Sequence, residues 1–231
     1  MLGILTDREG LTIPRGKILS WVTLALMGLF LYQFLVFQWE LIRNPFPNEY
    51  REGAILLTTQ ALLDGKNPYA LVNQPEYTNV YGILYHLVVY PFARLFGNSF
   101  PVHRSVSAGF IWASCGLMFW IMRWMRIPLV LNLGTTMILL GHLLFYITAL
   151  ARPDSMGVFL LLLSVVVPFR CGYSDRSLYA AIVCGILAFL VKPYCILGLT
   201  FLLLYVLVWR SPGEASTLGR WRPWGWVARW P

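Results

Sequence analysis

Three separated groups of ionisable residues could carry chemistry in this chain. The first holds Glu49 and Glu52, the second is Arg152-Pro153-Asp154, and the third is Lys192-Pro193. An ionised carboxylate can act as a general base, and a cation can stabilise developing negative charge. The question is whether the fold brings the three groups to one place.

The segment from Asn48 to Gly65 predicts a short polar helix. Asn48 is a good N-cap, and Gly65 stands where a left-handed residue ends a helix. Glu49 and Glu52 are three residues apart, so a helix places them on one face, and the first-turn position favours an ionised Glu49. We interpret residues 48–69 as an active-site loop. The alternative is that both glutamates are charges at a helix start that only face water.

The composition indicates an integral membrane protein. The chain is 58% hydrophobic and 12% charged, with a mean hydropathy of +0.64. The net charge of +8 does not point to nucleic acid, because the Lys and Arg residues mostly flank apolar runs, as membrane topology requires. The four cysteines form no C-x-x-C pair, so we expect them to pack in apolar segments rather than bind metal or form disulfides.

The apolar pattern predicts an all-α, polytopic transmembrane bundle in a plasma or inner membrane. Its candidate spans are residues 18–39, 105–122, 129–150, 155–169, 178–191 and 194–209. Residues 1–17 are predicted to form a cytoplasmic leader. Residues 18–209 are predicted to form the transmembrane domain. Residues 40–79 form the first outer loop, which holds the juxtamembrane helix. Residues 210–231 form a tail rich in Trp and Arg, which either lies among the headgroups or is the scar of a truncated gene.

A further apolar segment, residues 80–97, could cross the membrane or lie at its surface. If it does not cross, most of the basic residues collect on the cytoplasmic side, which the positive-inside rule prefers. We therefore interpret it as a re-entrant or interfacial helix. That topology places all three ionisable groups on the outer face.

An ordered set of motifs resembles a known family. The motifs are N-E-Y-R-E-G at 48–53, L-L-D-G-K-N-P-Y at 62–69, Y-G-I-L-Y at 81–85, F-G-N-S at 96–99, Arg104-Ser105, A-R-P-D-S at 151–155 and V-K-P at 191–193. Together, over residues 18–205, they resemble the GT-C membrane glycosyltransferases. That group includes the lipid-A aminoarabinose transferases, the protein O-mannosyltransferases and related bacterial mannosyltransferases.

The resemblance implies transfer of a sugar from a polyprenyl-phosphate donor to a lipid, glycan or protein acceptor at the outer face. Glu49 matches the family's catalytic base, although many relatives carry Asp, or an Asp-Glu pair, where this chain has Asn48-Glu49. Asp154 matches a second acidic residue in a later outer loop. A base must reach the acceptor hydroxyl, and cations must stand beside the departing phosphate.

The remaining candidates are expected to bind substrate. Lys192, Arg152 and Arg51 are candidates to stabilise the phosphate. Asp154 could orient Arg152, bind sugar hydroxyls or help to hold a divalent metal. No other cofactor is implied.

Glu52 and Tyr81 complete the predicted substrate-binding set. Tyr77, Tyr81 and Tyr85 recur every four residues, so they would line one helix face, as an interfacial stripe or as a platform for sugar rings.

Each of these features also has a purely structural explanation. Arg152 and Asp154 could simply close an interfacial loop, and Lys192 could extend its amine from a short helix to the membrane surface. His86 and His142 are expected to form hydrogen bonds inside the bundle rather than to bind metal. The whole chain could be a non-catalytic or truncated relative or subunit, or a transporter, although no internal repeat supports a transporter.

Overall fold

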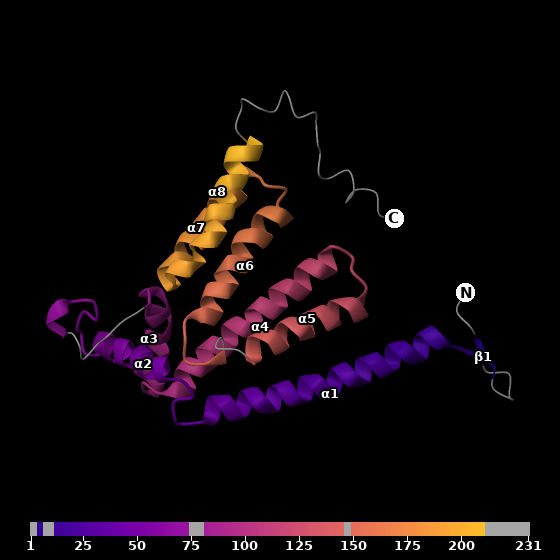
Figure 1. Ribbon diagram of the computed structural model, residues 1–231, viewed down its shortest axis with the longest axis horizontal. Coiled ribbons are helices and arrows are strands. Elements are labelled where there is room, and N and C mark those ends of the chain that lie inside the picture. Colours follow the sequence, from indigo (N-terminus) through magenta and orange to yellow (C-terminus); the bar gives the residue numbers. More distant parts are fainter. Residues whose placement is uncertain (1–3, 7–11, 74–80, 146–148, 211–231) are drawn as a thin grey trace.

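The computed structural model describes residues 4–6, 12–73, 81–145 and 149–210. The fold is helical, as predicted (Figure 1). The helices are α1 Arg15–Arg43, α2 Tyr50–Leu63, α3 Leu84–Phe96, α4 Phe100–Trp124, α5 Leu129–Leu144, α6 Asp154–Arg170, α7 Asp175–Val191 and α8 Ile196–Arg210, with 3-10 turns η1 Leu71–Asn73 and η3 Pro193–Cys195. Within the predicted leader, β1 Ile4–Thr6 and β2 Thr12–Pro14 pair antiparallel.

Six helices, α1 and α4 to α8, form a bundle in which each helix runs opposite to the bundle helix before it in the chain. α1 packs on α4 and α5, α4 packs on α6, and α7 packs between α6 and α8. The C-terminal ends of α1, α5 and α7 therefore meet the N-terminal ends of α4, α6 and α8 at one end of the bundle. The helices lie close together at this end and spread apart toward their other ends (Figure 1). We call it the converging end.

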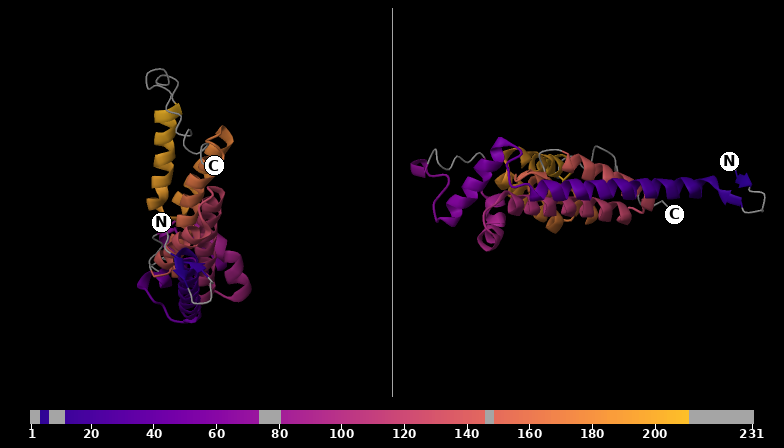
Figure 2. Two further views of the ribbon diagram at one scale, coloured as in Figure 1. Left: turned by 90° about the vertical axis from the view of Figure 1, so that its right-hand side faces the viewer. Right: turned by 90° about the horizontal axis from the view of Figure 1, so that it is seen from below.

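α2 and α3 cover the converging end. They pack on each other, and Figure 2 shows them at the end of the bundle away from the N-terminus. α3 has 13 residues and is followed by Gly97, whose φ of 86° a glycine adopts without strain. A helix of this length extends about 20 Å, less than the hydrocarbon core of a membrane. That residues 80–97 do not cross the membrane stays a prediction.

Among the residues that the structure describes, two helices are long and apolar enough to cross a membrane. They are Ile18–Arg43 within α1 and Phe100–Trp124, which is α4. α5 to α8 have 15 to 17 residues each, fewer than the roughly 20 that span a bilayer without tilt or thinning. The large apolar side chains of α1 are mostly exposed, as lipid contact requires. These features indicate association with a membrane.

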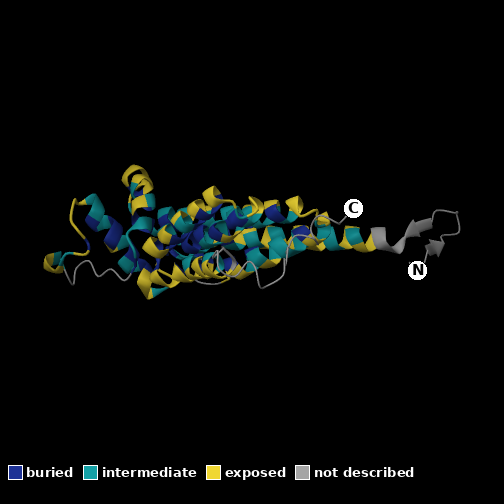
Figure 3. Ribbon diagram, turned by 90° about the horizontal axis from the view of Figure 1, so that it is seen from above, coloured by how far each residue is buried: buried dark blue, intermediate teal, exposed yellow. Residues whose placement is uncertain are grey.

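The buried side chains gather toward the converging end. Figure 3 shows buried positions concentrated there, whereas α1 is half-buried or exposed along most of its length. The largest apolar cluster joins α2, α3, α6 and α7, with Ile55, Tyr85, Leu160 and Val191 among its members. The well-packed part of the molecule is therefore the part that holds the three ionisable groups.

Gly82 allows the segment before α3 to lie against the end of α7. Its backbone N–H donates to Val191 O at 3.1 Å, and a Cβ at this position would overlap the carbonyl oxygen of Leu190. The contact holds Tyr81 beside Lys192, the residue that follows α7.

We expect Gly82→Ala to destabilise the protein, because the added methyl group can be accommodated only if the backbone moves away from α7. The thermal unfolding midpoint in detergent should fall by several degrees. Gly116→Ala is the matched control, since no atom lies within 4 Å of its added Cβ and alanine favours the helix. Equal midpoints for the two variants would contradict the close approach.

Candidate active site

The start of α2 is capped by Glu49. Its backbone is extended, with φ −151° and ψ 143°, and its Oε2 accepts a hydrogen bond from the backbone N–H of Arg51 at 3.1 Å. The prediction that Asn48 is the cap was therefore wrong by one residue, because the side chain of Asn48 bonds to Asn44 instead. The predicted end of the helix is confirmed, since Gly65 has φ 69° directly after the last helical turn.

Glu52 forms a fully buried ion pair with Arg104 of α4. Arg104 Nε donates to Oε1 at 2.9 Å and Arg104 Nη2 donates to Oε2 at 2.7 Å, and neither side chain is exposed. A parallel, two-bond contact of this kind fixes both position and orientation. Glu52 therefore does not face water, as the alternative interpretation of this glutamate required.

The remaining N–H groups of Arg104 hold the connection between α1 and α2. Nη1 donates to Leu41 O at 2.9 Å and to Asn44 O at 2.7 Å, and Nη2 donates to Phe46 O at 2.9 Å. With the two bonds to Glu52, all five N–H donors of the guanidinium are used. Arg104 thus fixes the chain that leads into Glu49.

The carboxylate of Glu52 is likewise filled by protein donors. Besides Arg104, the backbone N–H of Ala151 donates to Oε1 at 2.7 Å and that of Asn48 donates to Oε2 at 2.7 Å. Burial alone would raise the pKa of Glu52, but these hydrogen bonds and the charge of Arg104 outweigh burial, and the pKa lies below its ordinary value. The geometry gives Glu52 a positioning task in place of the predicted contact with substrate.

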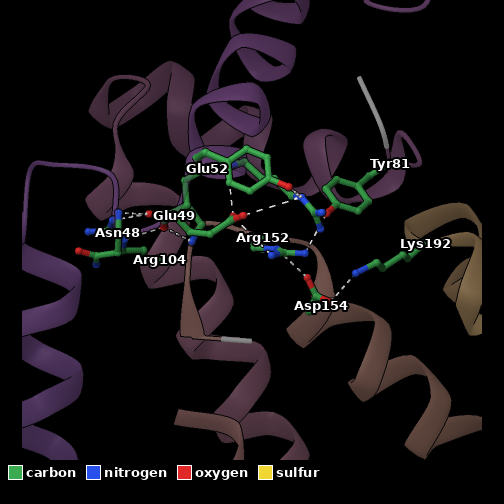
Figure 4. Close-up of polar contacts among 11 residues, drawn as sticks. Asn48, Glu49, Glu52, Tyr81, Arg104, Arg152, Asp154 and Lys192 are labelled. Atoms are coloured by element: carbon green, nitrogen blue, oxygen red, sulfur yellow. Dashed lines mark hydrogen bonds and ion pairs between the residues drawn. The ribbon is translucent and has the colours of Figure 1, made fainter. Parts of the chain in front are cut away.

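Arg152 connects the first two predicted groups (Figure 4). Nη1 lies 3.4 Å from Glu49 Oε2, Nε donates to Asp154 Oδ2 at 3.1 Å, and Nη2 donates to the hydroxyl of Tyr81 at 2.8 Å. Its side chain is 2% exposed. Arg152 therefore belongs to the interior of the site and does more than close a surface loop.

Lys192 brings in the third group. Its Nζ donates to Asp154 Oδ1 at 2.6 Å and lies 4.9 Å from the ring centre of Tyr81. Glu49, Arg152, Asp154 and Lys192 thus form a chain of alternating charge, which we call the charge chain. The predicted convergence of the three groups is present in the structure, drawn from the start of α2, the start of α6 and the end of α7.

One carboxylate oxygen of the charge chain is open. Glu49 Oε1 accepts no hydrogen bond from the described part of the chain, and its contact with Arg51 Nε is 3.8 Å long. The Glu49 side chain is 22% exposed. Both oxygens of Asp154, by contrast, accept hydrogen bonds from cations. Glu49 is therefore the acid of the chain with room to accept a further hydrogen bond.

A cleft of about 490 Å³ lies beside the charge chain. Its lining is Tyr50, Arg51, Ala54, Tyr81, Lys192, Pro193 and Tyr194. Three of the predicted binding residues, Arg51, Tyr81 and Lys192, share this lining. The volume falls within the range of about 300–1,000 Å³ typical of small-molecule sites.

The prediction of a tyrosine stripe on one helix face was wrong. Tyr81 precedes α3, whereas Tyr85 lies within it and buries its hydroxyl against Ser107 Oγ and His103 O. Tyr77 lies outside the described residues. Tyr81 is nevertheless at the site, through its hydroxyl and its ring.

Two further predictions concern a buried histidine and a divalent metal. His86 is buried and its Nδ1 lies 3.0 Å from Thr59 Oγ1, as expected for a hydrogen-bonded histidine, and burial lowers its pKa to about 3. Within the described ranges, no three His, Cys, Asp or Glu side chains gather as metal ligands. Of the three roles open to Asp154, its contacts support the orientation of Arg152 and Lys192.

Arg104 was not among the predicted site residues. The sequence did carry a signal, because Arg104 is the fifth residue of an apolar helix long enough to span a membrane. A charge without a partner is costly there, so an acidic or polar partner was to be expected.

Comparisons with protein-family models, with curated proteins and with solved structures found no match.

We expect Arg104→Met to destabilise the protein by about 3–5 kcal/mol, because it leaves Glu52 charged and buried. Glu52→Gln should also be costly, and the double variant should cost less than the sum of the two, since no charge is then left alone. The free energy of unfolding in mixed micelles measures all three. Arg94→Met, at an exposed position of α3, is the control; costs that simply add would contradict the pairing.

The lowered pKa of Glu52 makes stability depend on pH. Its contribution is complete above the ordinary carboxyl pKa and is lost as the pH falls through the lowered value, because the unfolded chain takes up the proton first. Wild-type unfolding free energy should therefore drop below about pH 4. Glu52→Gln should flatten this drop, and Glu40→Gln, at an exposed position, should keep it. An unchanged slope in Glu52→Gln would show that other groups cause the drop.

Proposed function

We propose that the protein is a polytopic membrane glycosyltransferase of GT-C type, which moves a sugar from a polyprenyl-phosphate donor to a hydroxyl of a lipid, glycan or protein acceptor. The observation that carries the proposal is the charge chain beside the cleft. Glu49, whose Oε1 accepts no hydrogen bond from the described residues, directly precedes Tyr50 and Arg51, and these two residues line the cleft together with Lys192. This arrangement brings a carboxylate for proton transfer and cations for a phosphate close together.

In this proposal α4 to α8 cross the membrane together with α1. Basic residues at the end opposite the site include Arg123 in the last turn of α4, Arg126 after α4, Arg170 at the end of α6 and Arg176 at the start of α7. The positive-inside rule assigns that end to the cytoplasm and the converging end to the outer face. The short helices α5 to α8 would be accommodated by local thinning of the bilayer.

Glu49 is assigned the role of general base. Its Oε2 accepts the N–H of Arg51 and lies near Arg152, so the carboxylate is held in one orientation. Its Oε1 remains available to take the proton of the acceptor hydroxyl as that oxygen forms a bond to the anomeric carbon of the donor sugar. The bond from this carbon to the phosphate oxygen breaks in the same step, and its electron pair leaves with the phosphate.

Arg51 and Lys192 are assigned to the leaving phosphate. Both line the cleft, and the Arg51 side chain is 45% exposed. With Arg152 they give three cations against the two carboxylates Glu49 and Asp154, which leaves one positive charge. An anionic phosphate balances that excess, and a positioned cation stabilises the charge that develops on it.

Asp154 is assigned a supporting role. It accepts a hydrogen bond from both Arg152 and Lys192, so it sets the distance between the cation beside the base and the cation in the cleft.

Sugar transfer in membranes supplied with polyprenyl-phosphate sugars tests the proposal. Glu49→Gln should lower the rate by about 10²–10⁴-fold, because the amide cannot take the proton. Glu40→Gln is the control, since Glu40 is exposed near the end of α1. Folding is checked by the unfolding midpoint of each variant.

Equal transfer by wild type and Glu49→Gln would remove Glu49 as the base. Absence of transfer by well-folded wild type with every donor would favour a non-catalytic relative.

A further inference from the structure

We infer that the exposed rings of Tyr50 and Tyr194 form a subsite for a sugar ring at the cleft, an inference that rests on the proposed sugar transfer. The two residues come from opposite parts of the chain. Tyr50 is the first residue of α2, and Tyr194 lies in η3 after α7, yet both line the same cleft.

The two tyrosines present most of their surface to the outside. Tyr50 is 78% exposed and Tyr194 is 76% exposed, whereas Tyr81, deeper in the same lining, is 7% exposed. Large aromatic side chains that remain exposed around a cleft, next to charged groups, provide apolar surface for a ligand.

Cations hold both rings in place. Arg51 Nε donates to the hydroxyl of Tyr50 at 2.6 Å, and its guanidinium carbon lies 5.1 Å from the centre of that ring. Lys192 Nζ lies 5.3 Å from the ring centre of Tyr194. Contacts of this kind restrict the rings before a ligand arrives, which lowers the entropy cost of binding.

The lining suits a sugar better than a hydrocarbon chain. A pyranose has apolar C–H faces that can pack on aromatic rings and hydroxyl groups around its edge that need polar partners. The cleft offers both, through tyrosine rings and through Arg51 and Lys192.

A second cavity shows the contrast. The groove between α3 and α4, of about 590 Å³, has an almost wholly apolar lining that includes Val88, Phe92 and Phe110. Its one hydroxyl, that of Ser105, already donates to Pro101 O at 2.7 Å. That lining lacks the polar edge that a sugar needs, and the tyrosine cleft has it.

The place of the subsite agrees with the proposed chemistry. Tyr50 directly follows Glu49, and Tyr194 lies two residues after Lys192. A ring held by the two tyrosines therefore lies close to both the proposed base and a proposed phosphate ligand. It belongs to the donor or to a saccharide acceptor, and these two sources differ in which Michaelis constant depends on the tyrosines.

Direct binding tests the subsite without turnover. The full chain in nanodiscs is titrated with methyl glycosides of mannose, glucose, galactose and arabinose, followed by saturation-transfer NMR. Mannitol serves as the ligand control, since it has the hydroxyls without the ring. Tyr50→Leu and Tyr194→Leu should each raise the dissociation constant of the preferred glycoside about tenfold. Tyr50→Phe and Tyr194→Phe keep the aromatic ring, so their dissociation constants should stay within about threefold of that of wild type.

Tyr179→Leu is the matched protein control, because Tyr179 is 71% exposed on α7 and does not line the cleft. Absence of glycoside binding by folded wild type, or equal binding by the Leu variants, would overturn the subsite. Glycoside binding that depends on the two tyrosines, without transfer from any donor, would keep the subsite and reject the transferase.

Where transfer occurs, the same variants identify the source of the ring. A raised KM for the donor in Tyr50→Leu and Tyr194→Leu assigns the ring to the donor, and a raised KM for the acceptor assigns it to a saccharide acceptor. Unchanged values of both constants would also overturn the subsite.

Discussion

The buried pair of Arg104 and Glu52 is the constraint on which the converging end depends. Burying two charges is stabilising only when the remaining donors and acceptors are also satisfied. Here two of the five N–H groups of Arg104 donate to Glu52, and the other three donate to carbonyls at the end of α1 and in the turn before α2. The carboxylate of Glu52 also accepts the backbone N–H groups of Asn48 and Ala151. The same bonds that make burial tolerable thus join segments far apart in the sequence.

The charge chain follows from that constraint. Ala151 is held by Glu52, so Arg152 leaves the backbone from a fixed point, and its carbonyl accepts a hydrogen bond from Ser107 Oγ at 3.1 Å. The side chain of Arg152 then lies between Glu49 and Asp154. A fully buried pair with no access to solvent therefore positions a second, partly exposed set of charges that can meet a ligand.

The helices and the convergence of the three ionisable groups could be predicted from the sequence. Apolar runs bounded by charges mark where helices end, and the membrane topology determines which helix ends lie on the same side. Sequence reasoning placed the cap of α2 one residue early, since Asn44 competes for the side chain of Asn48. It missed the role of Arg104 for a physical reason. Three of the partners of Arg104 are backbone carbonyls, and any residue type can supply a carbonyl. Spacing alone also could not show that Tyr81 precedes α3.

The cap of α2 divides the work of one carboxylate between its two oxygens. Oε2 of Glu49 accepts the backbone N–H of Arg51 and lies near Arg152, while Oε1 accepts no hydrogen bond from the described residues. A proton that arrives on Oε1 leaves the acceptor on Oε2 in place, so the helix start need not loosen when the group changes its charge. The side chain of an aspartate is one methylene shorter. It would be less able to cap the helix with one oxygen while it presents the other oxygen to a ligand, so glutamate suits this position better.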